Sequence, residues 1–145
     1  KSFLSTMLRL GAERSALSIV SDQIGAPTPA RLIALITQQA LTVLYNAQAA
    51  HRIESGVYHL APRGEVSWQG FACEIFQLAS NSGLPLSITP ENVAAIPTSD
   101  YPTPAARPLN SRLAVAKIER ALGIEMPSWQ SQLALTVEEI ASSRK

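Results

Sequence analysis

The sequence lacks the glycine-rich loop with which many enzymes hold a dinucleotide or a phosphate. Its seven glycines are scattered, and none falls into the spacing GxGxxG or GxxxxGK[ST]. It also lacks the HExxH, CxxC and clustered acidic patterns that bind metal ions. We therefore predict no cofactor-binding residue and no metal site in this chain.

A catalytic tyrosine pair is missing as well. In the Tyr-x-x-x-Lys arrangement, a lysine four residues after the tyrosine lowers the tyrosine pKa for proton transfer. Here Tyr45, Tyr58 and Tyr101 are followed at that distance by Ala49, Pro62 and Ala105. We predict no catalytic residue. The chain has the features of one half of a protein that serves in binding or packing and does not itself catalyse a reaction.

Strong charge, disulfides and long hydrophobic runs are also absent. Twelve basic and eleven acidic residues give a net charge of +1, too balanced for a surface that binds nucleic acid or acidic lipid. The most apolar run, 32–44, is broken by Gln38 and Gln39 and is too short to cross a bilayer. The lone Cys73 excludes an internal disulfide and is typical of a buried thiol. Because no signal peptide is evident, we expect a cytoplasmic protein without nucleic-acid or membrane partners.

The pattern of apolar residues predicts a mixed α/β domain, since 145 residues can bury a real core. The first two expected helices cover 2–10, with Gly11 as terminator, and 29–46. A third is capped by Ser67 and ends at Gly83, and a fourth is capped by Asn110 or Ser111 and ends at Gly123. The last expected helix begins at Pro127 and Ser128. The expected strands are 16–21, 56–61 and an edge strand at 84–89. Helix 29–46 is apolar around much of its circumference and is expected to pack on more than one side.

The segment 18–33 organises the rest of the chain. A buried strand ends at the polar pair Asp22 and Gln23, a Gly-Ala-Pro-Thr turn follows, and a helix starts near Pro29 with Thr28 as its N-cap. The carboxyl end of a strand is where α/β sheets present ligand-binding groups. Asp22 and Gln23 therefore either contact a ligand or satisfy the amides of neighbouring loops.

A second candidate segment, 97–108, contains four prolines and must be a rigid, extended loop. Long ordered loops are often functional. This loop is either one wall of a ligand site or a stiff connector on the surface.

Three motifs connect these segments to a known family. The runs DQxGxPT at 22–28, GxYHL at 56–60 and YPTPxxRPxNSRL at 101–113 resemble the carboxyl-terminal part of dTDP-4-dehydrorhamnose reductases, which belong to the extended short-chain dehydrogenase/reductase superfamily. The resemblance implies the carboxyl-terminal portion of a Rossmann-type α/β enzyme, mostly helical with a few short strands. Residues 1–145 would form its substrate-binding portion, and the amino-terminal NADP-binding half would be absent.

The resemblance also implies a reaction. Family members use NADPH to reduce the 4-keto group of dTDP-6-deoxy-L-lyxo-4-hexulose to dTDP-L-rhamnose for bacterial surface polysaccharide. The expected partners are the dTDP-sugar, the missing Rossmann half and a second copy of the chain in a homodimer. The fragment alone is expected to bind no cofactor and to be inactive.

Three side chains carry over as substrate-binding candidates. Arg107 fits the substrate diphosphate, because a guanidinium forks onto phosphate oxygens; the alternative is an ion pair that ties the proline loop down. Gln23 belongs to the DQxGxPT corner, and Asn110, like Ser111, is either a ligand group or a helix cap. Arg31 stands where some relatives have an acidic residue of a metal-bridged dimer, which makes that mode of dimerisation doubtful here.

Two other interpretations remain open. The chain could come from a non-catalytic regulatory or scaffolding relative that keeps the superfamily fold. It could also be a free-standing helical interaction domain, although that hypothesis leaves the three motifs unexplained.

Overall fold

The computed structural model describes residues 2–46 and 54–143. The helices of this part are α1 (Phe3–Glu13), α2 (Ala30–Tyr45), α3 (Trp68–Asn81), α4 (Ala116–Leu122) and α5 (Trp129–Ser142), with short 3₁₀ turns η2 (Pro90–Asn92) and η3 (Thr98–Asp100). The strands are β1 (Leu17–Val20), β2 (Ile24–Gly25), β3 (Val66–Ser67) and β4 (Val93–Ile96). The predicted fold class, α/β with mostly helices and a few short strands, is confirmed.

Serine side chains start three of the helices. Ser67 Oγ accepts a hydrogen bond from the Gly70 amide at 3.0 Å, which confirms the predicted cap. Ser128 Oγ accepts one from the Ser131 amide at 3.2 Å and is the N-cap of α5, which was predicted to begin at Pro127 and Ser128. Ser2 forms a reciprocal capping box with Ser5 at the start of α1. The prediction for α2 was one residue early: Pro29 is its N-cap, and the Thr28 hydroxyl donates to the Ala26 carbonyl instead.

Gly11 does not end the first helix, contrary to the prediction. It lies inside α1, where a Cβ atom would come within 2.6 Å of Cε1 of Phe76. The absence of a side chain at this position lets α1 approach α3 closely. The helix continues to Glu13 because the Arg14 amide still donates to the Leu10 carbonyl.

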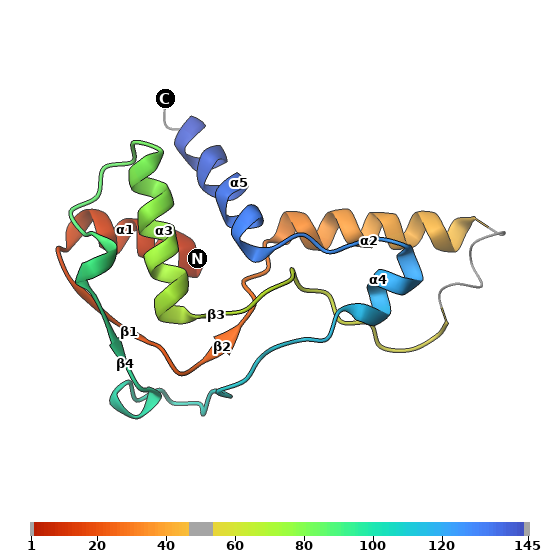
Figure 1. The fold of residues 1–145 in the computed structure, drawn as a ribbon, viewed down its shortest axis with the longest axis horizontal. Coiled ribbons are helices and arrows are strands. Elements are labelled where there is room, and N and C mark those ends of the chain that lie inside the picture. The colour runs from red at the N-terminus through yellow and green to blue at the C-terminus, as the bar shows by residue number, and fades with distance from the viewer. Residues whose placement is uncertain (1, 47–53, 144–145) are drawn as a thin grey trace.

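The core has two parts, which occupy different regions of Figure 1. In the larger one, α1, α3 and α5 pack together around Ile75, Phe76 and Val137, none of which is more than 1% exposed. In the smaller one, α2 lies beside α4, and Leu32 and Ile36 meet the apolar side of α4. The predicted stripe of α5 is confirmed, since Trp129, Leu133 and Val137 are buried in the larger core.

Only two short strand pairs form in the described residues. β1 pairs in parallel with β4, with Leu17 opposite Val93 and Val20 opposite Ile96, and β2 pairs antiparallel with β3. The predicted strands 56–61 and 84–89 are wrong, because neither segment has a neighbouring strand. β4 was missed by the sequence analysis, although it is the partner that β1 requires.

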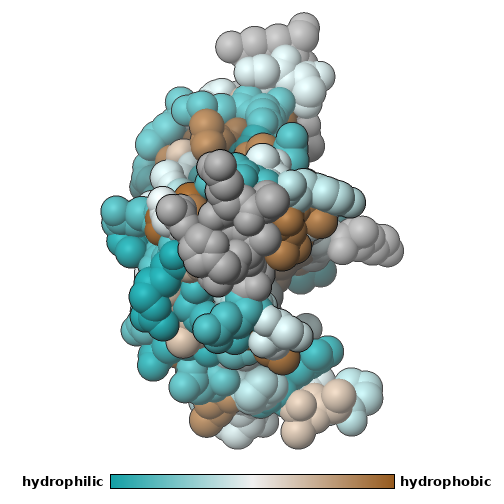
Figure 2. All heavy atoms as spheres, turned by 90° about the vertical axis from the view of Figure 1, so that its right-hand side faces the viewer, coloured by the Kyte–Doolittle hydropathy of each residue, from teal (hydrophilic) through white to brown (hydrophobic). Residues whose placement is uncertain are grey.

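Helix α2 packs on one side only against the residues that the structure describes, which corrects the prediction of packing on more than one side. Leu32 and Ile36 are buried, whereas Ile33, Leu41 and Leu44 on the next face are each between 46% and 48% exposed. Figure 2, which views the molecule from the side on the right of Figure 1, shows hydrophobic patches between hydrophilic areas. No helix of the described residues is long and apolar enough to cross a membrane.

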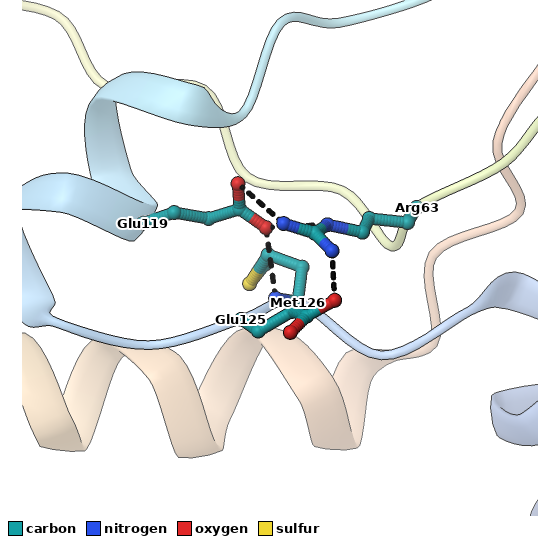
Figure 3. A network of polar contacts seen from close by, with 4 residues as sticks. All are labelled: Arg63, Glu119, Glu125 and Met126. Atoms are coloured by element: carbon teal, nitrogen blue, oxygen red, sulfur yellow. Dashed lines mark hydrogen bonds and ion pairs between the residues drawn. The ribbon is translucent and has the colours of Figure 1, made fainter.

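A polar network holds α4 against the segment before β3 (Figure 3). The Arg63 guanidinium donates to both carboxylate oxygens of Glu119, at 2.8 and 3.2 Å, and pairs with Glu125. The Glu119 carboxylate also accepts from the Met126 amide at 2.9 Å. Arg63 hydrogen bonds lower the pKa of Glu119, and the Met126 amide acts in the same direction.

Candidate functional site

The corner at 21–23 is joined to the start of the proline loop. The Ser21 amide donates to the Ile96 carbonyl at 2.9 Å, directly after the β1–β4 pair. The Asp22 carboxylate accepts from the Thr98 amide at 3.0 Å and from the Thr98 hydroxyl at 2.6 Å, and these bonds lower its pKa. Asp22 therefore satisfies a loop amide, the second of its two predicted roles.

Gln23 also contacts the start of this loop, and the strand that follows Gln23 holds its later part. The Gln23 side-chain amide donates to Thr98 Oγ1 at 3.1 Å, which leaves its carbonyl oxygen without a partner among the described residues. The Ile24 amide donates to the Leu109 carbonyl and the Ile24 carbonyl accepts from the Ser111 amide, both at 2.8 Å. The 97–111 segment is thus attached at both ends to the 21–24 corner.

Neither Asn110 nor Ser111 caps a helix, contrary to one predicted role. α4 starts only at Ala116, after Val115, whose side chain makes no capping bond. Asn110 Oδ1 instead accepts from the Arg112 amide two residues later, at 3.1 Å, which is a local turn. The backbone of both residues is used in the contact with Ile24.

Two clefts meet at this corner. One, of about 370 Å³, lies between the 24–27 turn and the start of α3. The other, of about 650 Å³, lies between α1, β1 and the 101–107 loop. Three side chains line both: Gln23, Trp68 and Arg107. The structure therefore brings together two of the predicted binding residues, whereas Asn110 lines neither cleft.

The charged residues that line these two clefts are all basic. Their charged lining residues are Arg107, shared by both, and Arg14 in the larger one, with no aspartate or glutamate among the lining residues. Arg107 is exposed and makes no hydrogen bond or ion pair with any residue that the structure describes. The alternative role, an ion pair tying the loop down, is not seen in that part of the chain. The clefts suit an anionic ligand.

The sequence analysis did not identify Trp68 as a residue that lines the clefts. It does contact the core, with its ring centroid 4.6 Å from that of Phe3, but it remains 42% exposed. The signal available in the sequence was a tryptophan at the first position of a helix, where burial is seldom complete. Among the described residues, no group of three or more His, Cys, Asp or Glu side chains could hold a metal ion.

The fold defines a class, because it matches part of the fold of solved extended short-chain dehydrogenase/reductases. The chain is similar to the solved dTDP-4-dehydrorhamnose reductase of Bacillus anthracis, determined in complex with NADP, with a TM-score of 0.71 and 30% identity over 92% of this chain and 41% of that one. The solved Clostridium acetobutylicum ortholog gives a TM-score of 0.75 and 28% identity over 97% of this chain and 44% of that one.

The family can be stated more narrowly. The model of the RmlD substrate binding domain matches residues 1–142, and the chain belongs to this family. It is 44% identical to the dTDP-4-dehydrorhamnose reductase of Burkholderia thailandensis over 98% of this chain, and 43% identical to that of Salmonella typhimurium over 88%. The chain spans 48% and 41% of those relatives' lengths, which is less than half of each.

Proposed function

We propose that this chain is the substrate-binding portion of an NADPH-dependent dTDP-4-dehydrorhamnose reductase, which reduces the 4-keto sugar to dTDP-L-rhamnose. One observation carries the proposal. In a chain of the substrate-binding family, the guanidinium of Arg107 lies where two clefts meet, and within the described part of the chain it has no partner and no acidic side chain lines the clefts. A diphosphate is the part of a dTDP-sugar that such a group recognises best.

The residue roles follow from what each side chain has left to offer. Arg107 donates to the diphosphate oxygens, and the Gln23 carbonyl oxygen accepts from a sugar hydroxyl, since its amide is held by Thr98. Asn110 was the third candidate, but its side-chain oxygen is already used by the Arg112 amide. We therefore assign the direct contacts to Gln23 and Arg107.

The clefts do not fit the cofactor. Among the described residues, Gly25 is the only glycine that lines the clefts, and it lies in a turn with Pro27, which offers no backbone N–H to a phosphate. A dinucleotide needs a run of such donors at a helix N-terminus. In this proposal, NADPH and the proton donor belong to the portion of the relatives that this chain does not span, and the chain alone is inactive.

The test is a hybrid enzyme. This chain would replace the matched part of the Burkholderia thailandensis reductase, and NADPH oxidation would be followed with the 4-keto dTDP-sugar. We expect the hybrid to be active, the separate chain to be inactive, and Arg107→Ala to raise KM in the hybrid. Arg120→Ala is the matched control, because Arg120 is exposed on α4 and lines neither cleft.

A folded hybrid that binds NADPH but does not reduce the sugar would contradict the proposal. It would favour the alternative, a non-catalytic relative with a regulatory or scaffolding role. The cytoplasmic location and the homodimer stay predictions.

A further inference from the structure

Trp68 occupies the point where the two clefts join. It is the first residue of α3, directly after the Ser67 cap and the β2–β3 pair, so its backbone is fixed by neighbouring hydrogen bonds. Its indole lines both clefts together with Arg107 and Gln23. Nothing in the proposed roles of Arg107 and Gln23 uses this side chain.

The indole is also held in place by other rings. Phe3 lies against it at a tilt of 47°, and Phe3 stacks on Phe71 with centroids 5.6 Å apart. Phe71 meets Trp129 edge to face at 6.0 Å. This aromatic series leads from the buried core to the clefts, and only its last member, Trp68, is substantially exposed, at 42%. A ring that is held in this way loses little entropy when a ligand contacts it.

The combination matches the two ends of a nucleotide. A nucleoside diphosphate presents a planar aromatic base at one end and an anion at the other. Aromatic side chains bind bases by stacking, and a guanidinium binds the phosphates. Trp68 and Arg107 offer these two kinds of contact on the same cleft walls, where acidic side chains are absent.

We propose that Trp68 is a substrate-contacting residue whose indole stacks on the thymine ring of the dTDP-sugar while Arg107 holds the diphosphate. The inference rests on the proposed function and adds the group that recognises the nucleotide rather than the hexose. It requires that the chain itself binds dTDP, without the sugar.

The chain contains two tryptophans, which makes the test direct. Trp129 is only 6% exposed and lines neither of the two clefts, so Trp68 is the accessible reporter. dTDP would be titrated into the 145-residue chain while tryptophan fluorescence and heat are recorded. We expect dTDP to quench the emission, and inorganic diphosphate to bind without quenching.

Two variants separate stacking from other causes. Trp68→Phe should abolish the quenching, since the remaining emission comes from Trp129. Trp68→Leu should weaken dTDP binding roughly tenfold, the usual scale for loss of one base–aromatic stack, and should leave diphosphate binding unchanged. Thermal melting of both variants checks that the fold is intact.

The outcomes distinguish this inference from the function on which it rests. If Trp68→Leu binds dTDP as tightly as wild type while Arg107→Ala does not bind, the inference is wrong and the proposed function stands. Quenching by a hexose 1-phosphate but not by dTDP would assign Trp68 to the sugar and also overturn it. If dTDP does not bind to the chain at all, the inference is also wrong, and the activity of the hybrid enzyme then decides the proposed function separately.

Discussion

At the scale of single residues, Asp22 controls the geometry of the corner. Its carboxylate accepts from the amide and the hydroxyl of Thr98, and these bonds hold its pKa below the ordinary value of 3.8. A carboxyl whose pKa is lowered on folding stabilises the protein above its unfolded pKa, and this stabilisation is lost as the pH falls through the folded value.

The first prediction follows from the lowered pKa of Asp22. Asp22→Asn should lower the free energy of unfolding at pH 7, and the difference from wild type should shrink as the pH falls below about 4. Urea denaturation at pH 7 and at pH 3 measures it. Asp100→Asn is the control, because Asp100 is exposed and, among the described residues, its carboxylate accepts only from the adjacent Ser99 hydroxyl. An equal effect of Asp22→Asn at both pH values would contradict the assignment.

Gly11 gives a second prediction, in which packing opposes helix propensity. Alanine normally favours a helix over glycine by about 1 kcal/mol. Here its Cβ would lie 2.6 Å from Phe76 and 3.0 Å from Ile88, and overpacking of a core costs about 1–3 kcal/mol. We expect Gly11→Ala to be destabilising in chemical denaturation.

A double-mutant cycle tests the cause. Phe76→Leu shortens the side chain that the new methyl group would meet, so the two substitutions together should cost less than the sum of their separate effects. Additive effects, or a stabilising Gly11→Ala, would show that α1 can move away from α3 without loss.

The sequence predicted some of these residues correctly and others not, for a physical reason. Ser67 was recognised as a cap, and Ser128 as the start of a helix, because each stands before a clear apolar stripe. Asn110 and Thr28 were misjudged because each can also bond to its own neighbouring backbone, and local pattern does not decide between a turn and a cap. Gln23 and Arg107 were brought to one site by long-range contacts that the motifs suggested but spacing could not show.

At the scale of elements, strands were the weak point of the prediction. The segment 56–61 has strand composition, but no other strand lies beside it in the described structure, and an isolated strand has no ladder. β4 was overlooked because its short run, VAAI, follows a proline turn and has little polar alternation. Pairing with β1, not local propensity, makes it a strand.

The network of Arg63 gives the third prediction at this scale. Glu119 accepts from two Arg63 nitrogens and from the Met126 amide, and its side chain is only 12% exposed; Glu125 makes one ion pair and is 74% exposed. Glu119→Gln should therefore lower the Tm clearly more than Glu125→Gln, since exposed pairs contribute little.

The stabilisation by the Arg63–Glu119 pair is expected to depend on pH. Because the pKa of Glu119 is lowered on folding, its stabilisation is present above the ordinary glutamate value of 4.5 and is lost as the pH falls through the folded pKa. The Tm difference between wild type and Glu119→Gln should thus be larger at pH 7 than at pH 3. Equal Tm values for the two variants at pH 7 would argue against a structural role for the network.

At the scale of the whole molecule, the two cores differ in completeness. The larger one is enclosed by α1, α3 and α5, whereas the smaller one leaves an apolar face of α2 uncovered by described residues. Ile33, Leu41 and Leu44 form this face. A helix in a complete globular domain normally buries such an apolar face. The chain also spans less than half of the relatives it matches. We expect the rest of the protein in those relatives to cover this face.

The last prediction compares one substitution in two contexts. In the separate chain, Leu41→Glu should change the stability by less than about 0.5 kcal/mol, as at other surface positions. In the hybrid with the Burkholderia thailandensis half, the same charge would be buried, and unfolding should become easier by about 2 kcal/mol or more. Gln38→Glu, on another exposed part of α2, should be neutral in both proteins. If Leu41→Glu is equally mild in the hybrid, α2 remains open to solvent there and another surface must join the halves.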